Sequence, residues 1–268
     1  MKKWNNYSGM DLTFVVCTYK ECPYLEESIV SLINQTVKAK IIISTSTPND
    51  YVKGIAQKYN IEVRVNPEGG QIKDYNFAMK QADTPLVMLA HQDEILRNTF
   101  VEDTLFGLNH AKDPIISFTD YIEMHNDIVD EKQSKMIKIK KLLLIPSKWK
   151  WLSGTKFGKR LILCMGDPIT HPSVVCVANK MPKEVFREEY KASMDWDLWE
   201  RLSKQKGSFV YVDKILLHHR MNDDNQTSVL LKTTNDRYNN EYEIFRRFWP
   251  KPIAKLIMKF YSKAYSYY

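Results

Sequence analysis

Short apolar runs alternate with amphipathic segments along the first hundred residues. Four runs have the length and composition of buried strands: 13–19, 40–44, 61–66 and 85–90. Three segments between them are predicted to be helical: 24–35, 48–59 and 74–81. This alternation with short links predicts an α/β fold, a mainly parallel twisted sheet flanked by helices, whose ligands bind beyond the carboxyl ends of the strands.

The second half of the chain is less regular. Three further strands are predicted: 114–121, 173–179 and 208–213. A helix is predicted over 195–204. Residues 229–268 have the pattern of an amphipathic helical appendage, broken at Pro250 and Pro252.

Polar residues follow three of the strands predicted in the first half. They occupy positions 18–21, 44–47 and 91–94. Because the carboxyl ends of parallel strands meet at one edge of a sheet, we expect these residues to form one site. No Gly-x-Gly-x-x-Gly follows the first strand, which argues against a dinucleotide-binding dehydrogenase.

The net charge of +7 is concentrated in two segments. Residues 132–160 hold ten Lys and Arg, residues 246–268 hold six, and neither segment contains an acid. The rest of the chain, with 23 of the 39 bases against 32 acids, is net negative. The basic excess therefore belongs to local surfaces and not to the whole protein.

Both basic segments also carry aromatic side chains, among them Trp149, Trp151, Trp249 and Phe260. Basic groups among aromatic rings are typical of contact with an anionic membrane surface. The alternatives are a solvated basic face and nucleic-acid binding, and the sequence shows no nucleic-acid-binding motif. We expect an anionic membrane surface as a partner, and no nucleic acid.

The C-terminal segment repeats apolar residues at helical spacing. Ile253, Leu256, Ile257 and Phe260 form the stripe, with lysines beside it. A lipid-facing helix is one interpretation, and a helix packed on the main domain is the alternative.

Several features favour a cytoplasmic protein. The four cysteines form no Cys-x-x-Cys pair, the N-terminus lacks the apolar core of a signal peptide, and no apolar run is long enough to cross a bilayer. Together with the basic segments, they predict a protein associated peripherally with the inner face of the cell membrane.

Five blocks of sequence stand in one order along the chain. They are FVVCTYKECPYLEESIVSLINQT, NPEGGQIKDYNFAMKQADTPLVMLAHQDE, DPITHPSV, MDWDLWERL and HHRMNDDNQTS. The series resembles the family-2 glycosyltransferases over residues 12–228. The resemblance implies a GT-A domain over 1–228, with a nucleotide-sugar-binding half (1–97) and an acceptor-binding half (98–228) that holds the basic insertion 132–160. The helical segment 229–268 follows it.

In this family an Asp-x-Asp motif at a strand end holds a divalent cation against the diphosphate of the donor. Here His91 replaces the first Asp, and Asp93 keeps the second place, followed by Glu94. The resemblance implies Asp93 and Glu94 as ligands of Mg²⁺ or Mn²⁺, with His219 as a further candidate. His91 is a candidate contact for either the nucleotide or the metal.

The resemblance also implies a catalytic base. MDWDLW aligns with a motif whose acidic residue removes the proton of the acceptor hydroxyl, and Asp195 occupies that place. Ser193 is positioned to cap the helix. Asp197, two residues farther on, is predicted to point elsewhere and to serve the helix dipole, and the same structural role is the alternative for Asp195.

The resemblance also implies residues that contact the nucleotide sugar and the acceptor. Those for the nucleotide sugar are Thr18, Tyr19, Glu21, Ser44, Ser46, Lys73, Asp74, Asn76, His91, Gln92 and Arg220. Those for the acceptor are His171 and Trp196, and a packed core histidine is the alternative for His171. Ser44 to Ser46 replace the family's Asp-Asp-Gly-Ser, and Asn222 replaces an expected histidine.

These observations favour an inverting glycosyltransferase that adds one sugar from a nucleotide-sugar donor, most simply a UDP-sugar, to a lipid-linked saccharide. The family's role implies capsule or lipopolysaccharide synthesis. The sequence lacks Gln-x-x-Arg-Trp, the mark of processive synthases. The alternatives are a nucleotidyltransferase on a similar sheet, for which the glycine-rich signature is missing, and a catalytically degenerate relative that binds nucleotide or glycan.

Overall fold

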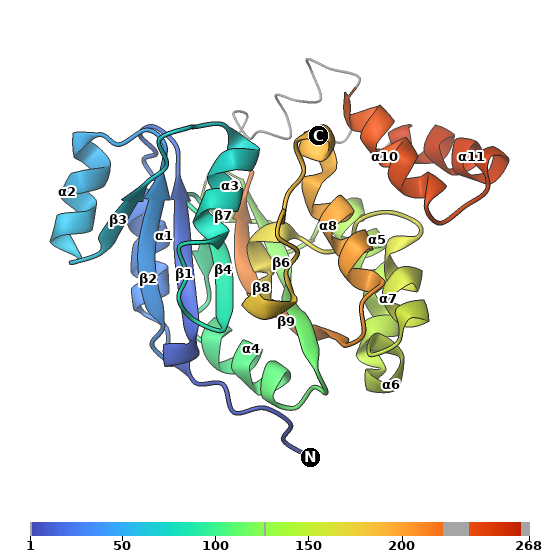
Figure 1. Cartoon of the computed structure of the whole chain (residues 1–268), viewed down its shortest axis with the longest axis horizontal. Helices are drawn as coiled ribbons and strands as arrows, with labels where there is room; N and C mark the ends of the chain where they lie inside the picture. Colours follow the sequence, from blue (N-terminus) through green and yellow to red (C-terminus); the bar gives the residue numbers. More distant parts are fainter. Residues whose placement is uncertain (1, 126, 222–235, 264–268) are drawn as a thin grey trace.

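The computed structural model describes residues 2–125, 127–221 and 236–263. Within them, nine strands form one sheet in the order β3-β2-β1-β4-β8-β6-β9-β5, with β7 paired to β6. Helices cover the sheet, and the C-terminal helices lie at the end opposite α2 (Figure 1). The last predicted block, from Asn222 onward, and residues 229–235 of the predicted appendage lie outside the described residues.

The first half of the sheet is parallel, as predicted. Its strands are β1 (Leu12–Thr18), β2 (Lys40–Thr45), β3 (Glu62–Val65) and β4 (Leu86–His91). The helices between them are α1 (Leu25–Ile33), α2 (Asp50–Lys58) and α3 (Gln71–Met79). Helix α3 begins three residues before the predicted start, because Gly70 adopts a φ of 99° and completes the turn ahead of Gln71.

The second half of the sheet is mixed. Its elements are β5 (Ile95–Leu96), α4 (Phe100–Asn109), β6 (Pro114–His125), β7 (Ile128–Val129), β8 (Val175–Val177) and β9 (Ser208–Arg220). Strand β8 runs antiparallel to β4 and β6, whereas β9 runs parallel to β6. Helix α4 was not predicted, and β9 extends seven residues beyond its predicted end at 213 through irregular pairing with β6.

The basic insertion is helical and comprises α5 (Lys135–Leu144), the 3-10 turn η2 (Ile145–Lys148), α6 (Lys150–Ser153) and α7 (Lys156–Leu163). Helix α8 (Met194–Ser203) follows the 3-10 turns η3 (His171–Ser173), η4 (Ala178–Lys180) and η5 (Glu188–Ser193). A further 3-10 turn, η1 (Gly9–Asp11), precedes β1.

Several basic side chains of the two segments are paired with acids or carbonyls from other parts of the fold. At least five of the sixteen bases have partners elsewhere in the described part of the chain: Lys141 with Asp120, Lys148 with Asp213, Arg160 with Glu200, Arg247 with Asp197, and the buried Lys159 with the carbonyls of Gln205 and Gly207. Burial lowers the pKa of Lys159 to about 8. These five side chains stabilise the fold and are not available to a partner.

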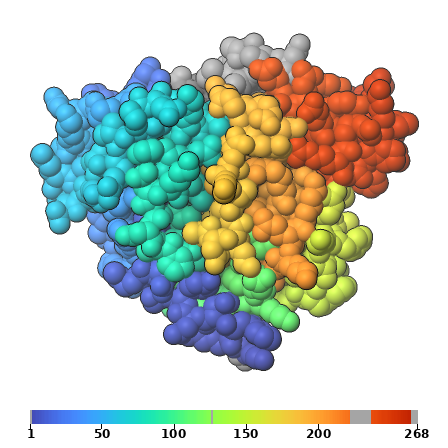
Figure 2. Space-filling model, viewed as in Figure 1, coloured from blue at the N-terminus to red at the C-terminus, as the bar shows by residue number. Residues whose placement is uncertain are grey.

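The C-terminal segment forms α10 (Asp236–Arg246) and α11 (Lys251–Tyr261), and it packs on the rest of the protein. Phe245 is fully buried against Trp196, and Ala254 and Met258 of α11 are also fully buried. In the space-filling view these helices lie directly against α8 (Figure 2). The chain breaks at Pro250, whereas Pro252 sits in the first turn of α11, where a missing N–H costs nothing.

The predicted apolar stripe of α11 is not the face that packs. Ile253, Leu256 and Phe260 are exposed, and of the stripe only Ile257 is partly buried against the core. The helix therefore packs through its Ala254 and Met258 side and keeps most of the stripe at the surface. None of the helices that the structure describes combines the length and apolar character required to cross a membrane.

Alternation along the strands gives the sheet a core on each face. In β1, Val15 contributes to one core cluster, whereas Phe14 and Val16 contribute to the other. The cluster that contains Val15 also contains Phe245 and Met258, so the C-terminal helices share the core of the sheet.

This packing predicts that Phe245→Ala lowers the free energy of unfolding by about 3 to 5 kcal/mol, because it removes a buried ring and leaves a cavity. The exposed ring of Phe260 is the matched control, and Phe260→Ala should change stability by less than about 0.5 kcal/mol. Urea denaturation of the two variants measures both. Equal effects of the two substitutions would contradict the packing of α10.

Candidate functional site

The carboxyl ends of β1, β2 and β4 bring the three predicted polar segments together. In the pairing of these strands, Cys17 lies opposite both Ser44 and His91. The backbone N–H of Tyr19 donates to the side chain of Gln92 at 3.0 Å, and that of Lys20 donates to Thr47 at 2.6 Å. The three strand ends therefore form one continuous polar edge.

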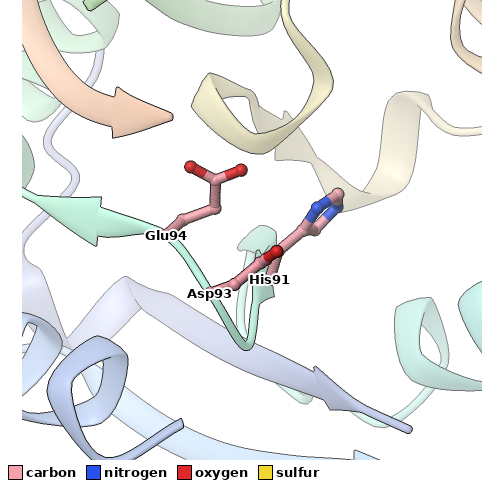
Figure 3. Close-up of side chains that lie close together, drawn as sticks. All are labelled: His91, Asp93 and Glu94. Atoms are coloured by element: carbon pink, nitrogen blue, oxygen red, sulfur yellow. The ribbon is translucent and has the colours of Figure 1, made fainter. Parts of the chain in front are cut away.

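The turn after β4 carries a compact group of potential metal ligands. Ligand atoms of His91, Asp93 and Glu94 all lie within 4.8 Å of one another. Figure 3 shows the three side chains on this single turn. Glu94 is buried; its Oε1 lies 2.5 Å from Nδ1 of His219, and its Oε2 has no hydrogen-bond partner in the described part of the chain.

The charges of Asp93 and Glu94 on this turn favour the binding of a cation. Burial and the neighbouring charge of Glu94 raise the pKa of Asp93. Burial alone would lower the pKa of His219, but the charge and hydrogen bond of Glu94 raise it. A desolvated pair of carboxylates with an unpartnered buried oxygen is stabilised by a positive charge, so the residues present suit a divalent ion.

The rings of Tyr75 and His171 pack around His91, at the start of this turn. Nε2 of His91 lies 3.3 Å from Nδ1 of His171, and the ring of Tyr75 stacks on His91 with centroids 5.8 Å apart. Burial, and then the neighbouring His91, lower the pKa of His171 to about 3, and burial lowers that of His91. Both imidazoles are neutral at physiological pH, so His91 has one unprotonated ring nitrogen whose lone pair can bind a metal.

His171 itself is buried. Its ring packs edge-on against Phe186 with centroids 5.3 Å apart, next to Tyr75. This is the environment of the packed core histidine that was its alternative interpretation. Contact of His171 with an acceptor stays a prediction.

Asp195 stands in the first turn of α8 and is half-buried. Its Oδ1 accepts a hydrogen bond from the N–H of Trp196 at 2.8 Å. Ser193 occupies the predicted cap position but makes no capping hydrogen bond. Burial, and then the charge of Asp195, raise the pKa of Asp167, a residue of the DPITHPSV block that we had not selected. Asp195 therefore belongs to the same acidic environment as Asp167.

Asp197 points away from the site, as predicted, but its role is larger than a helix-dipole charge. Its fully buried carboxylate accepts hydrogen bonds from Arg187, Arg201 and Arg247. Burial opposes ionisation, but the hydrogen bonds from Arg187 and Arg247 lower the pKa of Asp197. The buried Glu200 extends this cluster.

Some of the predicted nucleotide contacts are exposed to solvent, whereas others are buried or hydrogen-bonded to other residues of the protein. Tyr19, Glu21 and Lys73 are exposed at the edge. Thr18 and Ser44 are buried at the strand ends. Asp74 accepts hydrogen bonds from Ser46 and Asn66, which orders the loops around it. Asn76 binds the backbone N–H and carbonyl of Phe186 with its amide, so it connects α3 to the loop before η5.

Two predicted contacts occupy buried positions. Trp196 has an exposed fraction of 1%, donates from its indole N–H to the carbonyl of Leu163, and packs on Phe245, so it faces the C-terminal helices and offers no surface to an acceptor. Arg220 is equally buried, pairs with Glu27 and Asp127, and lies 3.8 Å over the ring of Tyr24. Its guanidinium joins β9 to α1, and its Nε donates to the carbonyl of Asp93 on the candidate metal turn at 3.3 Å. Contact of Arg220 with a diphosphate stays a prediction.

Tyr75 is a site residue that the sequence analysis missed. It lies between Asp74 and Asn76, both of which were selected, and only the three-dimensional structure brings its ring against His91. Burial and the charges of Cys17, Asp93 and Asp195 raise the pKa of Tyr75. Tyr75 thus packs on the last residue of β4, and the charges of Asp93 and Asp195 both oppose ionisation of its hydroxyl.

Comparison with known proteins shows to which family the chain belongs. The model of glycosyl transferase family 2 matches residues 13–162. The chain belongs to glycosyl transferase family 2. No curated protein matches it at a significant level.

Solved structures give the fold of this family member. S. aureus TarS 1–349 in complex with UDP-GlcNAc is similar with a TM-score of 0.64 and 17% identity, over 96% of this chain and 73% of that chain. The mannosyltransferase PcManGT from Pyrobaculum calidifontis, in complex with GDP-Man and Mn²⁺, is similar with a TM-score of 0.60 and 14% identity, over 94% and 68% of the two chains. The predicted GT-A fold is therefore confirmed.

The acidic turn predicts that Asp93→Ala weakens Mn²⁺ binding at least about tenfold, because one carboxylate ligand and its charge are lost. Calorimetric titration of the purified protein with Mn²⁺ measures this affinity. Asp50→Ala, an acid exposed at the start of α2, is the control and should bind like the wild type. Wild-type affinity in the Asp93 variant would mean that the cation binds elsewhere.

Proposed function

We propose that the protein transfers one hexose from a nucleotide-sugar donor to a saccharide acceptor with inversion at the anomeric carbon. The observation that carries the proposal is a pair of carboxylates: Asp93, which has a ligand atom within 4.8 Å of those of His91 and Glu94, and the half-buried Asp195. One carboxylate stands on the turn that would hold a diphosphate, and the other opens α8. A donor and an acceptor hydroxyl could meet between them.

His91, Asp93 and Glu94 would hold a divalent cation, Mg²⁺ or Mn²⁺. Bound there, the ion would neutralise the charge that develops on the diphosphate leaving group. An imidazole among carboxylates favours Mn²⁺ over Mg²⁺, because Mg²⁺ prefers oxygen ligands only. The Mn²⁺ in the structure of PcManGT is consistent with this choice.

Asp195 would act as the base. Its carboxylate accepts the proton of the acceptor hydroxyl while the oxygen of that hydroxyl bonds to the anomeric carbon and the bond to the diphosphate breaks. The half-buried position of Asp195 lets an acceptor approach, in contrast to the fully buried Asp197.

The donor we propose is a UDP-sugar, supported by the UDP-GlcNAc bound to S. aureus TarS. Tyr19, Glu21 and Lys73 lie exposed where the base and diphosphate would bind. The acceptor we propose is a lipid-linked saccharide in capsule or lipopolysaccharide synthesis. Such an acceptor would bring a cytoplasmic enzyme to the inner face of the membrane as a peripheral protein.

The base assignment predicts that Asp195→Asn reduces kcat at least about a hundredfold, because the amide cannot accept the proton. Affinity for the donor should stay within about twofold of the wild type, since the base acts only in the transition state. Turnover with a panel of nucleotide sugars and calorimetry with UDP measure the two quantities.

Asp197→Asn is the matched control on the same helix. It should lower the melting temperature, because it leaves three half-buried arginines without their fully buried carboxylate. Asp195→Asn should leave the melting temperature close to that of the wild type. A variant of Asp195 that turns over at the wild-type rate would remove this residue from the role of base.

A further inference from the structure

Exposed apolar side chains are concentrated in the two basic segments. Among the described residues, eighteen large hydrophobic side chains are exposed, and eleven of them lie in 132–165 and 246–263. We call these eleven the docking face: Ile139, Leu142, Ile145, Trp149, Trp151, Phe157, Leu161, Met165, Ile253, Leu256 and Phe260. Trp151 and Phe157 are 74% and 69% exposed, so they contact little else in the protein.

The helices of the docking face are already anchored by other side chains. Helix α5 buries Ile137 and Leu144, and α11 buries Ala254 and Met258. A helix that packs through one face normally presents polar residues on the other. Apolar residues on both faces of these helices mark a surface that a partner covers.

The two basic segments, 132–165 and 246–263, pack against each other and form one layer of helices. The indole N–H of Trp249 donates to the carbonyl of Cys164 at 2.7 Å, and the guanidinium of Arg160 lies 4.4 Å over the ring of Phe248. Arg160 also donates to the carbonyl of Arg247 at 2.8 Å. Helices α5, α7 and α11 accordingly occupy the same end of the molecule (Figure 1).

Exposed lysines lie among the apolar side chains of this layer. They are Lys135, Lys138, Lys150 and Lys156 in the first segment and Lys251, Lys255 and Lys259 in the second. Residues 132–165 and 246–263 contain no acid. The chemistry of the layer therefore combines a positive field with aromatic and aliphatic groups.

We propose that the docking face binds the surface of a membrane that contains anionic lipid. Lysines attract the headgroups, and the tryptophan and phenylalanine rings enter the interface beside them. The inference deepens the proposed function by naming the surface that would present the active site to a lipid-linked acceptor.

Charge argues against a second copy of the chain as the partner. In a twofold-symmetric dimer the same lysine-rich surface would face itself, and like charges would oppose each other. Burial of the apolar side chains without repulsion requires a partner that is both anionic and apolar, as a lipid surface is.

Vesicles of phosphatidylcholine mixed with phosphatidylglycerol test the proposal, with vesicles of phosphatidylcholine alone for comparison. The full chain should sediment with the mixed vesicles at low salt, release from them at high salt, and bind the neutral vesicles weakly. Tryptophan emission should shift to the blue on binding, as Trp149 and Trp151 enter the interface.

Two double variants separate the apolar and basic contributions. Trp151→Ser with Phe157→Ser, and Lys255→Gln with Lys259→Gln, should each weaken partitioning into mixed vesicles about tenfold. The controls are Phe106→Ser, a ring 59% exposed on α4, and Lys183→Gln with Lys206→Gln, two exposed lysines outside the layer. The controls should bind like the wild type, and all variants should keep the wild-type melting temperature and affinity for UDP.

Three results would overturn the proposal: no sedimentation with mixed vesicles at low salt, equal losses in the control and test variants, or a dimer at assay concentration that Trp151→Ser with Phe157→Ser dissociates. Failure of vesicle binding would leave turnover of a soluble acceptor intact. Failure of the proposed function would leave vesicle binding intact, so the two failures are distinguishable.

Discussion

The buried acid–arginine cluster behind α8 is the constraint on which the second half of the structure depends. Asp197 and Glu200 have no solvent exposure, and their charges are compensated by arginines from α7 and α8, from the loop before η5 and from the turn after α10. Removal of one partner from such a cluster leaves a buried uncompensated charge, which is strongly destabilising. The cluster therefore connects the basic insertion, α8 and the C-terminal helices. Asp195 stands at the start of α8, two residues before this anchor, so its position follows from the cluster.

The sequence predicts best what depends on local pattern. The apolar runs of β1, β2 and β4 and the helices between them appear within three residues of their predicted bounds, because a buried parallel strand and its crossover helix have short-range signatures. The far half of β9 escapes prediction because long-range pairing with β6 decides it. The stripe of α11 shows the same limit: periodicity reveals an amphipathic helix, but only tertiary packing shows that Ala254 and Met258 are its buried side.

In the candidate site, too, the sequence predicts some residues, and only the structure reveals others. The order of the strands predicts that the turns after β1, β2 and β4 meet, and the polar edge has this arrangement. Tyr75 and Asp167 are found only in three dimensions, because they reach the site from α3 and from the loop after α7. Trp196 and Arg220 lie in blocks that resemble the family, yet burial engages both side chains in contacts within the protein. Resemblance locates the segment, and packing decides which side chain of the segment faces the ligand.

The proposed function requires a cation on Asp93 that binds the diphosphate of the donor at this edge of the sheet. A crystal structure of the protein soaked with UDP and Mn²⁺, recorded at the manganese absorption edge, tests it most directly. We expect an anomalous peak in contact with the carboxylate of Asp93 and with the diphosphate of UDP. UDP bound at another surface, or a manganese peak away from His91, Asp93 and Glu94, would rule out this cation site.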